Sequence, residues 1–263
     1  MSEIPTHEVM QPVAAMNKFK RAYLEQNGLR KYRHEESLIH KECGRLGMEV
    51  VPYWAKQVQR RQLPLTRECF ICGDMDAMHG AMKHLGIEVP VPNDFPKSLE
   101  PYFHRRVWRS SVAALESALY DGREVFAKPA GRRKLFTGRV FQSPSDMSFL
   151  SGVSRQEPLW CSEIVSWTSE FRIYVVGADI VSQDHYAGDA SASLSQSSIS
   201  EAIQQFAASG EAPAAYGIDF GLLDTGETAL VEANDGYALG AYSIDAASYA
   251  RVLFTRWHQL THS

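Results

Sequence analysis

The sequence predicts an α/β domain followed by an α+β domain in which antiparallel sheets dominate. Helix and strand patterns alternate in the first half, an order that favours parallel strand pairing. The second half instead contains short apolar runs joined by tight turns. Several prolines between residues 90 and 101 indicate a rigid connection between the halves. We therefore expect a polar N-terminal extension over residues 1–34, the α/β domain over 35–115 and the α+β domain over 116–263.

The first half is defined by its helix signals. An apolar-periodic helix ends at Gly47, a residue type that commonly ends helices, and Asp74 is of the type that caps the start of one. The expected elements are a helix over 35–46, strands over 48–52 and 68–73, a helix over 74–84, a strand over 86–90 and a helix over 104–120.

The second half contains strand patterns in close succession, and no internal repeat is evident there. A serine-rich segment over 191–200 precedes a helix that ends at Gly210, and Ser243 can cap a final helix. The expected strands span 124–128, 138–142, 159–165, 170–176 and 179–186, followed by a hairpin over 217–233, with helices over 199–208 and 243–260.

Composition excludes several classes of protein. With 263 residues, 44% hydrophobic and 22% charged, the chain has the composition of a globular protein. A net charge of −4 argues against a dedicated nucleic-acid binder, which usually contains a strongly basic domain. No apolar stretch approaches the roughly 20 residues of a membrane span, and the start of the chain lacks the pattern of a secretion signal. We therefore expect a cytoplasmic protein that does not enter a membrane.

A hairpin near the C-terminus carries the main candidate site. If its loop is Thr225-Gly226, or all four residues 224–227, then Asp219 lies directly opposite Glu232. Like charges in that position are destabilising unless a cation lies between them. Asn234 shares the face of Glu232 and adds a third oxygen. Two carboxylates and an amide suit Mg²⁺ that also binds phosphates, although a three-residue loop would separate the pair.

Candidate phosphate-binding cations occur earlier in the chain. Lys128 ends an apolar strand, and a basic loop over 131–138, which includes Lys134, could fold over a polyphosphate. If Gly177-Ala178 forms a turn, then 172 faces 183 and 170 faces 185. One polar face would then carry the side chains of Glu170, Arg172, Gln183 and His185. Arg172 is of the type that stabilises a transferring phosphoryl group.

Together and in this order, these segments resemble the ATP-grasp superfamily. The resemblance covers about residues 120–245, and residues 35–115 look like the pre-ATP-grasp domain of that family. It implies that Lys128 and Lys134 hold the phosphates of ATP, that Glu163 holds the ribose or adenine edge, and that Glu170 belongs to the same nucleotide site. It also implies that Arg172 acts on the transferring phosphoryl group. Mg²⁺ would be held by Asp219, Glu232 and Asn234.

One position departs from the family pattern. Many ATP-grasp enzymes have an arginine shortly before the metal-binding aspartate, but Tyr216-Gly217-Ile218 precede Asp219 here. Arg172, Lys134 or Arg139 could supply the missing charge.

The resemblance implies an ATP- and Mg²⁺-dependent ligase that joins a carboxylate to an amine through an acyl phosphate and releases ADP and phosphate. A small-molecule kinase on the same scaffold and a nucleotide-binding interaction protein without turnover are the alternatives. The expected substrates are small-molecule or peptide carboxylates and amines. Their identity, the choice of amine or thiol acceptor, and homo-oligomerisation stay open.

Overall fold

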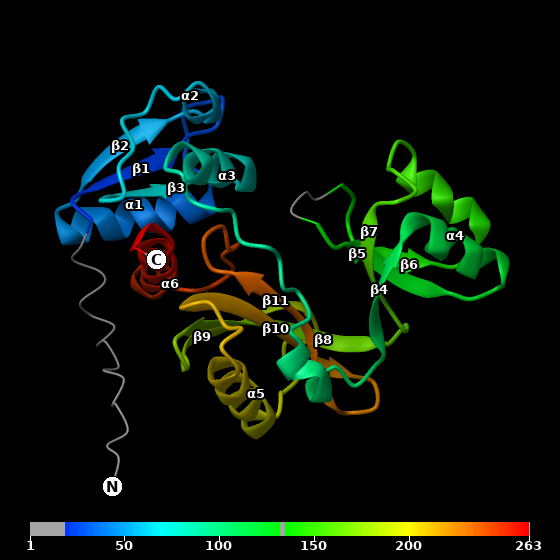
Figure 1. The fold of residues 1–263 in the computed structure, drawn as a ribbon. Coiled ribbons are helices and arrows are strands. Elements are labelled where there is room, and N and C mark those ends of the chain that lie inside the picture. Colours follow the sequence, from blue (N-terminus) through cyan, green and yellow to red (C-terminus); the bar gives the residue numbers. More distant parts are fainter. Residues whose placement is uncertain (1–18, 132–134, 263) are drawn as a thin grey trace, which may run out of the picture.

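A computed structural model describes residues 19–131 and 135–262 of the chain. The described residues form three sheets, with helices packed on each of them (Figure 1). The predicted class, an α/β unit followed by α+β structure with antiparallel sheets, is confirmed.

The first sheet is parallel and has the strand order β2-β1-β3. Its strands are β1 (Arg21–Glu25), β2 (Glu49–Tyr53) and β3 (Cys69–Cys72), and its helices are α1 (His34–Leu46), α2 (Ala55–Gln59) and α3 (Met75–His84). Asp74 caps α3 by accepting a hydrogen bond from the Ala77 amide. The left-handed conformation of Gly47 ends α1, as its position in the sequence predicted.

Two expectations for this region were wrong. Residues 86–90 form no strand, because Gly86 has a φ of 67° and continues the turn that follows α3. The segment expected to be an N-terminal extension contains β1, the central strand of the sheet. The strand Arg21–Glu25 is short and has a charged residue at each end, so the polar and basic residues around it masked its apolar centre.

The second sheet is antiparallel, with the order β4-β7-β5-β6. It contains β4 (Val107–Ser111), β5 (Val125–Pro129), β6 (Arg139–Phe141) and β7 (Pro158–Ser162), and it packs against α4 (Val112–Tyr120) and the 3-10 helix η3 (Pro144–Leu150). Because β4 pairs with β7, this sheet begins before the domain boundary that we expected at residue 115.

The third sheet has the order β11-β10-β8-β9. It contains β8 (Trp167–Val176), β9 (Asp179–Gly188), β10 (Ala215–Leu223) and β11 (Thr228–Asp235). Helix α5 (Gln196–Ser209) and the 3-10 helix η2 (Lys97–Tyr102) pack on one face of this sheet. Helix α6 (Ala246–His262) lies between this sheet and the first unit, which is the parallel sheet with α1, α2 and α3 (Figure 1). The buried core around α6 therefore includes residues of both units.

The β10–β11 hairpin pairs Asp219 with Glu232, as predicted, but by a different route. Its loop has three residues between Leu223 and Glu227, so Leu222 faces Thr228 near the turn. A β-bulge then shifts the register between Phe220 and Asp219 and restores the pairing. The loop alone would have separated the two carboxylates.

The β8–β9 hairpin differs more from expectation. Gly177-Ala178 does form the turn, but two register shifts follow, so Arg172 faces Asp184 and Glu170 faces Ala187. Gln183 and His185 face Ile173 and Phe171 instead, and the His185 ring packs against Phe171. The predicted polar face of four residues is therefore wrong for Gln183 and His185.

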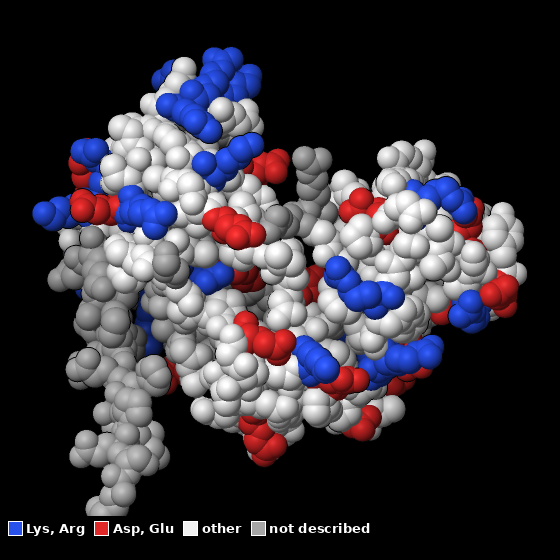
Figure 2. Space-filling view, in the orientation of Figure 1, with Lys and Arg blue, Asp and Glu red and all other residues white. Residues whose placement is uncertain are grey.

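The surface shows no continuous basic stripe on the face in Figure 2, where acidic and basic side chains are interspersed and basic ones gather mainly over the first unit. Within residues 19–131 and 135–262, no helix is both long and apolar enough to span a membrane.

Candidate active site

A cavity of about 810 Å³ lies between the second and third sheets, next to α3 and α6. The second sheet contributes β5 and the segment before β6, and the third sheet contributes β8, β9 and β11. The connection after α3 and the loop after β11 complete the walls. The chemistry-bearing side chains along its walls include Asp94, Lys128, Glu170, Arg172, Tyr186, Glu232 and Asn234.

Asp219 and Arg172 form a buried ion pair on neighbouring strands of the third sheet. Their backbones are directly paired across β10 and β8. The Arg172 guanidinium donates to both Asp219 carboxylate oxygens, with Nε–Oδ1 at 2.8 Å and Nη2–Oδ2 at 2.7 Å. This two-point geometry gives the strongest type of side-chain hydrogen bond. Of Arg172 and Arg139, the two candidate replacements for the missing arginine that the structure describes, Arg172 is the one in contact with Asp219.

Glu232 pairs with the second cation, Lys128. The Lys128 ammonium contacts Glu232 Oε2 and also lies 2.7 Å from Asp94 Oδ2. Asp94 belongs to the connection after α3, and its carbonyl accepts a hydrogen bond from the Ala233 amide on β11. The strand-end lysine therefore joins the second sheet to the edge of the third.

Asn234 bridges the two carboxylates. Its side-chain amide donates to Glu232 Oε1 at 3.1 Å and approaches Asp219 Oδ2 at 3.5 Å. Rotating this amide by 180° would place its oxygen there, next to the two carboxylates. Mg²⁺ prefers such oxygen ligands and retains positions for water and phosphate. Among the described residues, no group of three or more His, Cys, Asp or Glu side chains is placed to hold a metal ion, so a site here would depend on the Asn234 amide as well as on carboxylates.

Burial and pairing act in opposite directions on these acids. The pKa of Asp219 rises to about 6, because burial disfavours its charged form by more than the hydrogen bonds and charge of Arg172 favour it. Burial also acts to raise the pKa of Glu232, but contact with Lys128 lowers it overall. Burial acts to lower the pKa of Arg172, yet Asp219 raises it overall. Asp219 is thus the acid closest to titrating near neutral pH.

Sequence comparison identifies the family. The family model of the ATP-grasp domain, clade family 2, matches residues 102–252, more than half of the chain. The chain belongs to this ATP-grasp family. None of the curated proteins matches the sequence.

Solved structures share the ATP-grasp fold. A RimK domain ATP-grasp protein from Sphaerobacter thermophilus has a TM-score of 0.56 at 12% identity, covering 90% of this chain and 98% of that chain. D-alanine–D-alanine ligase from Bacillus anthracis has a TM-score of 0.53 at 10% identity, with coverages of 92% and 95%. Macrocyclase MdnC bound with precursor peptide MdnA, from Microcystis aeruginosa, has a TM-score of 0.52 at 9% identity, with coverages of 89% and 98%.

An aromatic wall completes one side of the ATP-grasp cavity. The Tyr186 hydroxyl donates to Glu170 Oε2 at 2.8 Å, and its ring stacks on Tyr242 at 4.9 Å between centroids. The Arg172 guanidinium lies 5.2 Å from the Tyr242 ring centroid. These contacts restrict the rotation of Arg172 beside Asp219.

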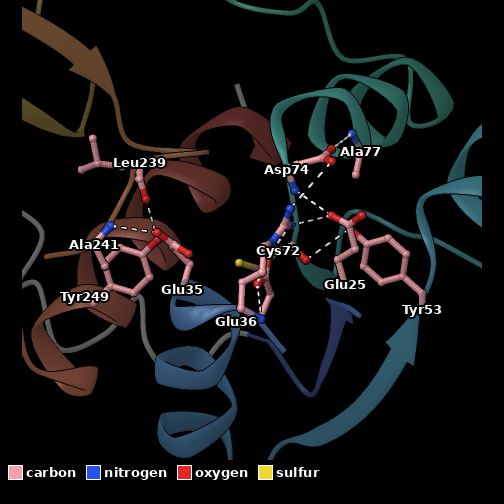
Figure 3. A network of polar contacts seen from close by, with 11 residues as sticks. Glu25, Glu35, Glu36, Tyr53, Cys72, Asp74, Ala77, Leu239, Ala241 and Tyr249 are labelled. Carbon is pink, nitrogen blue, oxygen red and sulfur yellow. Dashed lines mark hydrogen bonds and ion pairs between the residues drawn. The ribbon is translucent and has the colours of Figure 1, made fainter. Parts of the chain in front are cut away.

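The loop after β11 also holds Arg172 and is itself fixed from the first unit. The Gly240 carbonyl accepts a hydrogen bond from Arg172 Nη1 at 3.3 Å. On either side of it, the Ala241 amide donates to Glu35 of α1, and Tyr249 of α6 donates to the Leu239 carbonyl (Figure 3). The first unit thus contributes to the geometry of the site without lining most of it.

Two other candidates from the sequence, Glu163 and Arg139, lie outside the cavity lining. Glu163 is not among the residues that line the cavity; its carboxylate accepts a hydrogen bond from the Arg106 amide. Arg139 also lies outside the lining and stacks on Phe149. Lys134 lies outside the described residues.

Sequence reasoning missed Asp94 as a site residue. The signal available was an acidic residue within a proline-rich connection, in Pro92-Asn93-Asp94-Phe95-Pro96. Nothing in that segment indicated that it would run along β11 and meet a lysine 34 positions further along the chain.

Proposed function

We propose that this chain is an ATP- and Mg²⁺-dependent ligase that joins a carboxylate to an amine and releases ADP and phosphate. The observation that supports the proposal best is the convergence of Lys128, Arg172, Glu232 and Asn234 on one cavity. Asp219 is buried behind this lining, where it pairs with Arg172. The volume of about 810 Å³ is in the range that accommodates a nucleotide together with a small substrate.

The charge balance at these strands supports a metal–nucleotide complex. Lys128 and Arg172 face the carboxylates of Asp94, Glu170, Asp219 and Glu232, so acidic groups outnumber basic ones. Such a site repels a free polyphosphate. Magnesium held by Asp219, Glu232 and Asn234 would neutralise part of that negative charge and polarise the phosphates. Lys128 and Arg172 would then exchange part of their contacts with carboxylates for contacts with phosphate oxygens.

The cavity favours direct transfer of the phosphoryl group to a bound substrate. Its described lining contains no Cys, Ser or His that could act as a protein nucleophile. In the proposed reaction, the substrate carboxylate takes the γ-phosphoryl group from ATP, and the amine then displaces phosphate from the acyl phosphate. Lys128 and Arg172 would stabilise the charge on the transferred group. The fold shared with D-alanine–D-alanine ligase is the reason to prefer a ligase over a kinase.

The test is to measure ADP release with ATP and Mg²⁺, alone and with mixtures of amino acids and short peptides, and to identify the product by mass spectrometry. We expect ADP release that depends on both a carboxylate and an amine, with an amide product. A stable phosphorylated compound would instead indicate a kinase. ATP binding without turnover in any mixture would contradict the ligase proposal.

Matched variants assign the activity to the site. Glu232→Gln removes a proposed metal ligand and should nearly abolish ADP release. Glu227→Gln makes the same chemical change at an exposed position of the same hairpin and should leave it intact. Equal activities for the two variants would contradict the metal assignment.

A further inference from the structure

The β-bulge in β11 decides which face of the sheet carries Glu232. Near the turn, Phe220 faces Leu230; beyond the bulge, Asp219 faces Glu232, so Val231 is the extra residue. Without the bulge, the register near the turn would continue and place Val231 opposite Asp219. Glu232 would then point to the other face, because side chains alternate along a strand. The proposed metal site therefore requires the bulge.

Arg105 binds the backbone of this bulge. Its Nη1 donates to the Leu230 carbonyl at 2.7 Å, and its Nη2 donates to the Val231 carbonyl at 3.2 Å. In a regular strand, successive carbonyls point in opposite directions, whereas here two successive carbonyls accept hydrogen bonds from one guanidinium. β11 is an edge strand, so no strand lies on its side away from β10 to satisfy a carbonyl there.

Arg105 is itself held in place. Its Nη1 also donates to the Phe103 carbonyl at 2.9 Å, and its guanidinium lies 5.1 Å from the Trp167 ring centroid and 5.8 Å from that of Phe95. The preceding residue, His104, has a φ of 48°, a left-handed conformation that is uncommon for residues with a side chain. The backbone is thus bent at the point that directs Arg105 to β11.

Arg105 carries a partly buried charge that, within the described parts of the chain, is not in an ion pair. Burial lowers its pKa to about 10, although the charge of Glu170 acts in the opposite direction. A planar guanidinium with several fixed donors suits a pair of carbonyls better than an ammonium group does. Its contacts are therefore directed at the backbone of the bulge.

We propose that Arg105 is a positioning residue that maintains the Val231 bulge and thereby keeps Glu232 opposite Asp219 for metal binding. The effect of Arg105 on metal binding rests on the proposed function, whereas its effect on the bulge does not. Arg105 does not line the cavity, so it acts through Glu232 and not on substrate.

The first measurement is the binding of Mn²⁺ with ATP, followed by electron paramagnetic resonance in the absence of acyl substrate and amine. Arg105→Ala should weaken Mn²⁺ binding by about tenfold or more, as is usual when a residue that orients a metal ligand is lost. Arg105→Lys keeps the charge and most of the volume, and should give a smaller loss because one ammonium cannot reach both carbonyls equally. Arg123→Ala removes an exposed arginine and should bind as the unaltered protein does.

A double variant separates positioning from general destabilisation. If Arg105 acts through Glu232, adding Arg105→Lys to Glu232→Gln should weaken Mn²⁺ binding no further. Additive losses in the double variant would overturn the proposal. So would unaltered Mn²⁺ binding in both Arg105 variants.

Hydrogen exchange at the amides of residues 230–233 tests the bulge without any ligand. We expect faster exchange there in Arg105→Lys and Arg105→Ala, and unchanged exchange in Arg123→Ala. If the unaltered protein binds no Mn²⁺, the proposed function fails, but this exchange result still decides the role of Arg105. Unchanged exchange at residues 230–233 would overturn that role.

Discussion

Two groups of acids lie on either side of the loop that follows β11, each with at least one fully buried member, and they differ in what surrounds them. The first group, the N-terminal acid cluster, consists of Glu25, Glu36 and Asp74 with Arg33. The second consists of the cavity acids Asp94, Asp219 and Glu232. Glu36 and Asp219 are about equally buried, with 1% and 2% of their surfaces exposed. Burial of a charge therefore does not by itself identify the functional site.

The partners of the acids distinguish the two groups. In the N-terminal acid cluster, Arg33 contacts both Glu25 and Glu36. The Asp74 amide donates to Glu25 at the start of α3 (Figure 3). The adjoining hollow has a volume of about 200 Å³, below the usual size of roughly 300–1,000 Å³ for a small-molecule site. Of the cavity acids, Asp94 and Glu232 line a space of about 810 Å³. The first group fixes helix starts, whereas the second lies beside a space of the size of a ligand site.

The largest expected effect on turnover is that of Asp219→Asn. We expect ADP release to fall by more than about 100-fold, since loss of a partner of a metal ligand already costs about 10–100-fold. Steady-state assays over a range of Mg²⁺ concentrations measure this loss. Asp224→Asn, at an exposed position of the same hairpin, is the control. Activity within a few-fold of the unaltered protein would remove Asp219 from the site.

Lys128→Met should act next most strongly, on nucleotide affinity. The ammonium is a proposed phosphate contact, and a hydrogen bond to a charged group contributes about 1.5–3 kcal/mol, which corresponds to weakening of about tenfold or more. Calorimetric titration with ATP and Mg²⁺ measures the dissociation constant. Lys97→Met, a lysine outside the cavity lining, serves as the comparison. Equal affinities for the two variants would show that Lys128 only supports the structure.

The raised pKa of Asp219 predicts a difference in acid stability. Its pKa rises from 3.8 to about 6, so the folded state binds this proton more tightly than the unfolded state does. The contribution of Asp219 to stability therefore grows as the pH falls from about 6 towards 3.8. Between pH 6.5 and pH 4.5, metal-free protein should gain about 2 kcal/mol of unfolding free energy relative to Asp219→Asn. Urea unfolding at both pH values tests this; a constant difference between the two proteins contradicts the shift.

The smallest expected effect on turnover is that of Glu36→Gln in the N-terminal acid cluster. Glu36 accepts hydrogen bonds from the Arg33 backbone amide and guanidinium. Weakening them should lower the free energy of unfolding by about 1–3 kcal/mol. The kcat and the KM for ATP, measured well below the unfolding temperature, should stay unchanged. A loss of activity comparable to that of Asp219→Asn would erase the distinction between the two acid groups.

The residues that the sequence could identify are those that share one hairpin or one strand end. Glu232 and Asn234 share a face by alternation along one strand, and Lys128 ends its strand before a proline. Asp219 does lie opposite Glu232 as predicted, but only because a bulge restores the register. The fold class followed from the order of apolar patterns. These features depend on local spacing, which is visible in one dimension.

Features that depend on bulges or on distant pairing could not be derived in this way. A bulge shifts the register by one residue and leaves little trace in composition. The predicted loop length of the β10–β11 hairpin was wrong, and the predicted pair of Asp219 with Glu232 was right because a bulge compensated for the difference. In the β8–β9 hairpin the same effect moved Gln183 and His185 to the opposite face. Asp94 and Arg105 lie on a connection whose path along β11 is set by tertiary contacts.

The path of that connection has a mechanical consequence. Residues 90–106 link the first unit to the second sheet, yet they are also hydrogen-bonded to β11 of the third sheet at Ala233, Leu230 and Val231. Any swing of one lobe against another must therefore either break these bonds or pull the edge strand along with it. The segment therefore couples the three sheets, so substitutions within it can alter the position of Glu232 relative to Asp219 from a distance.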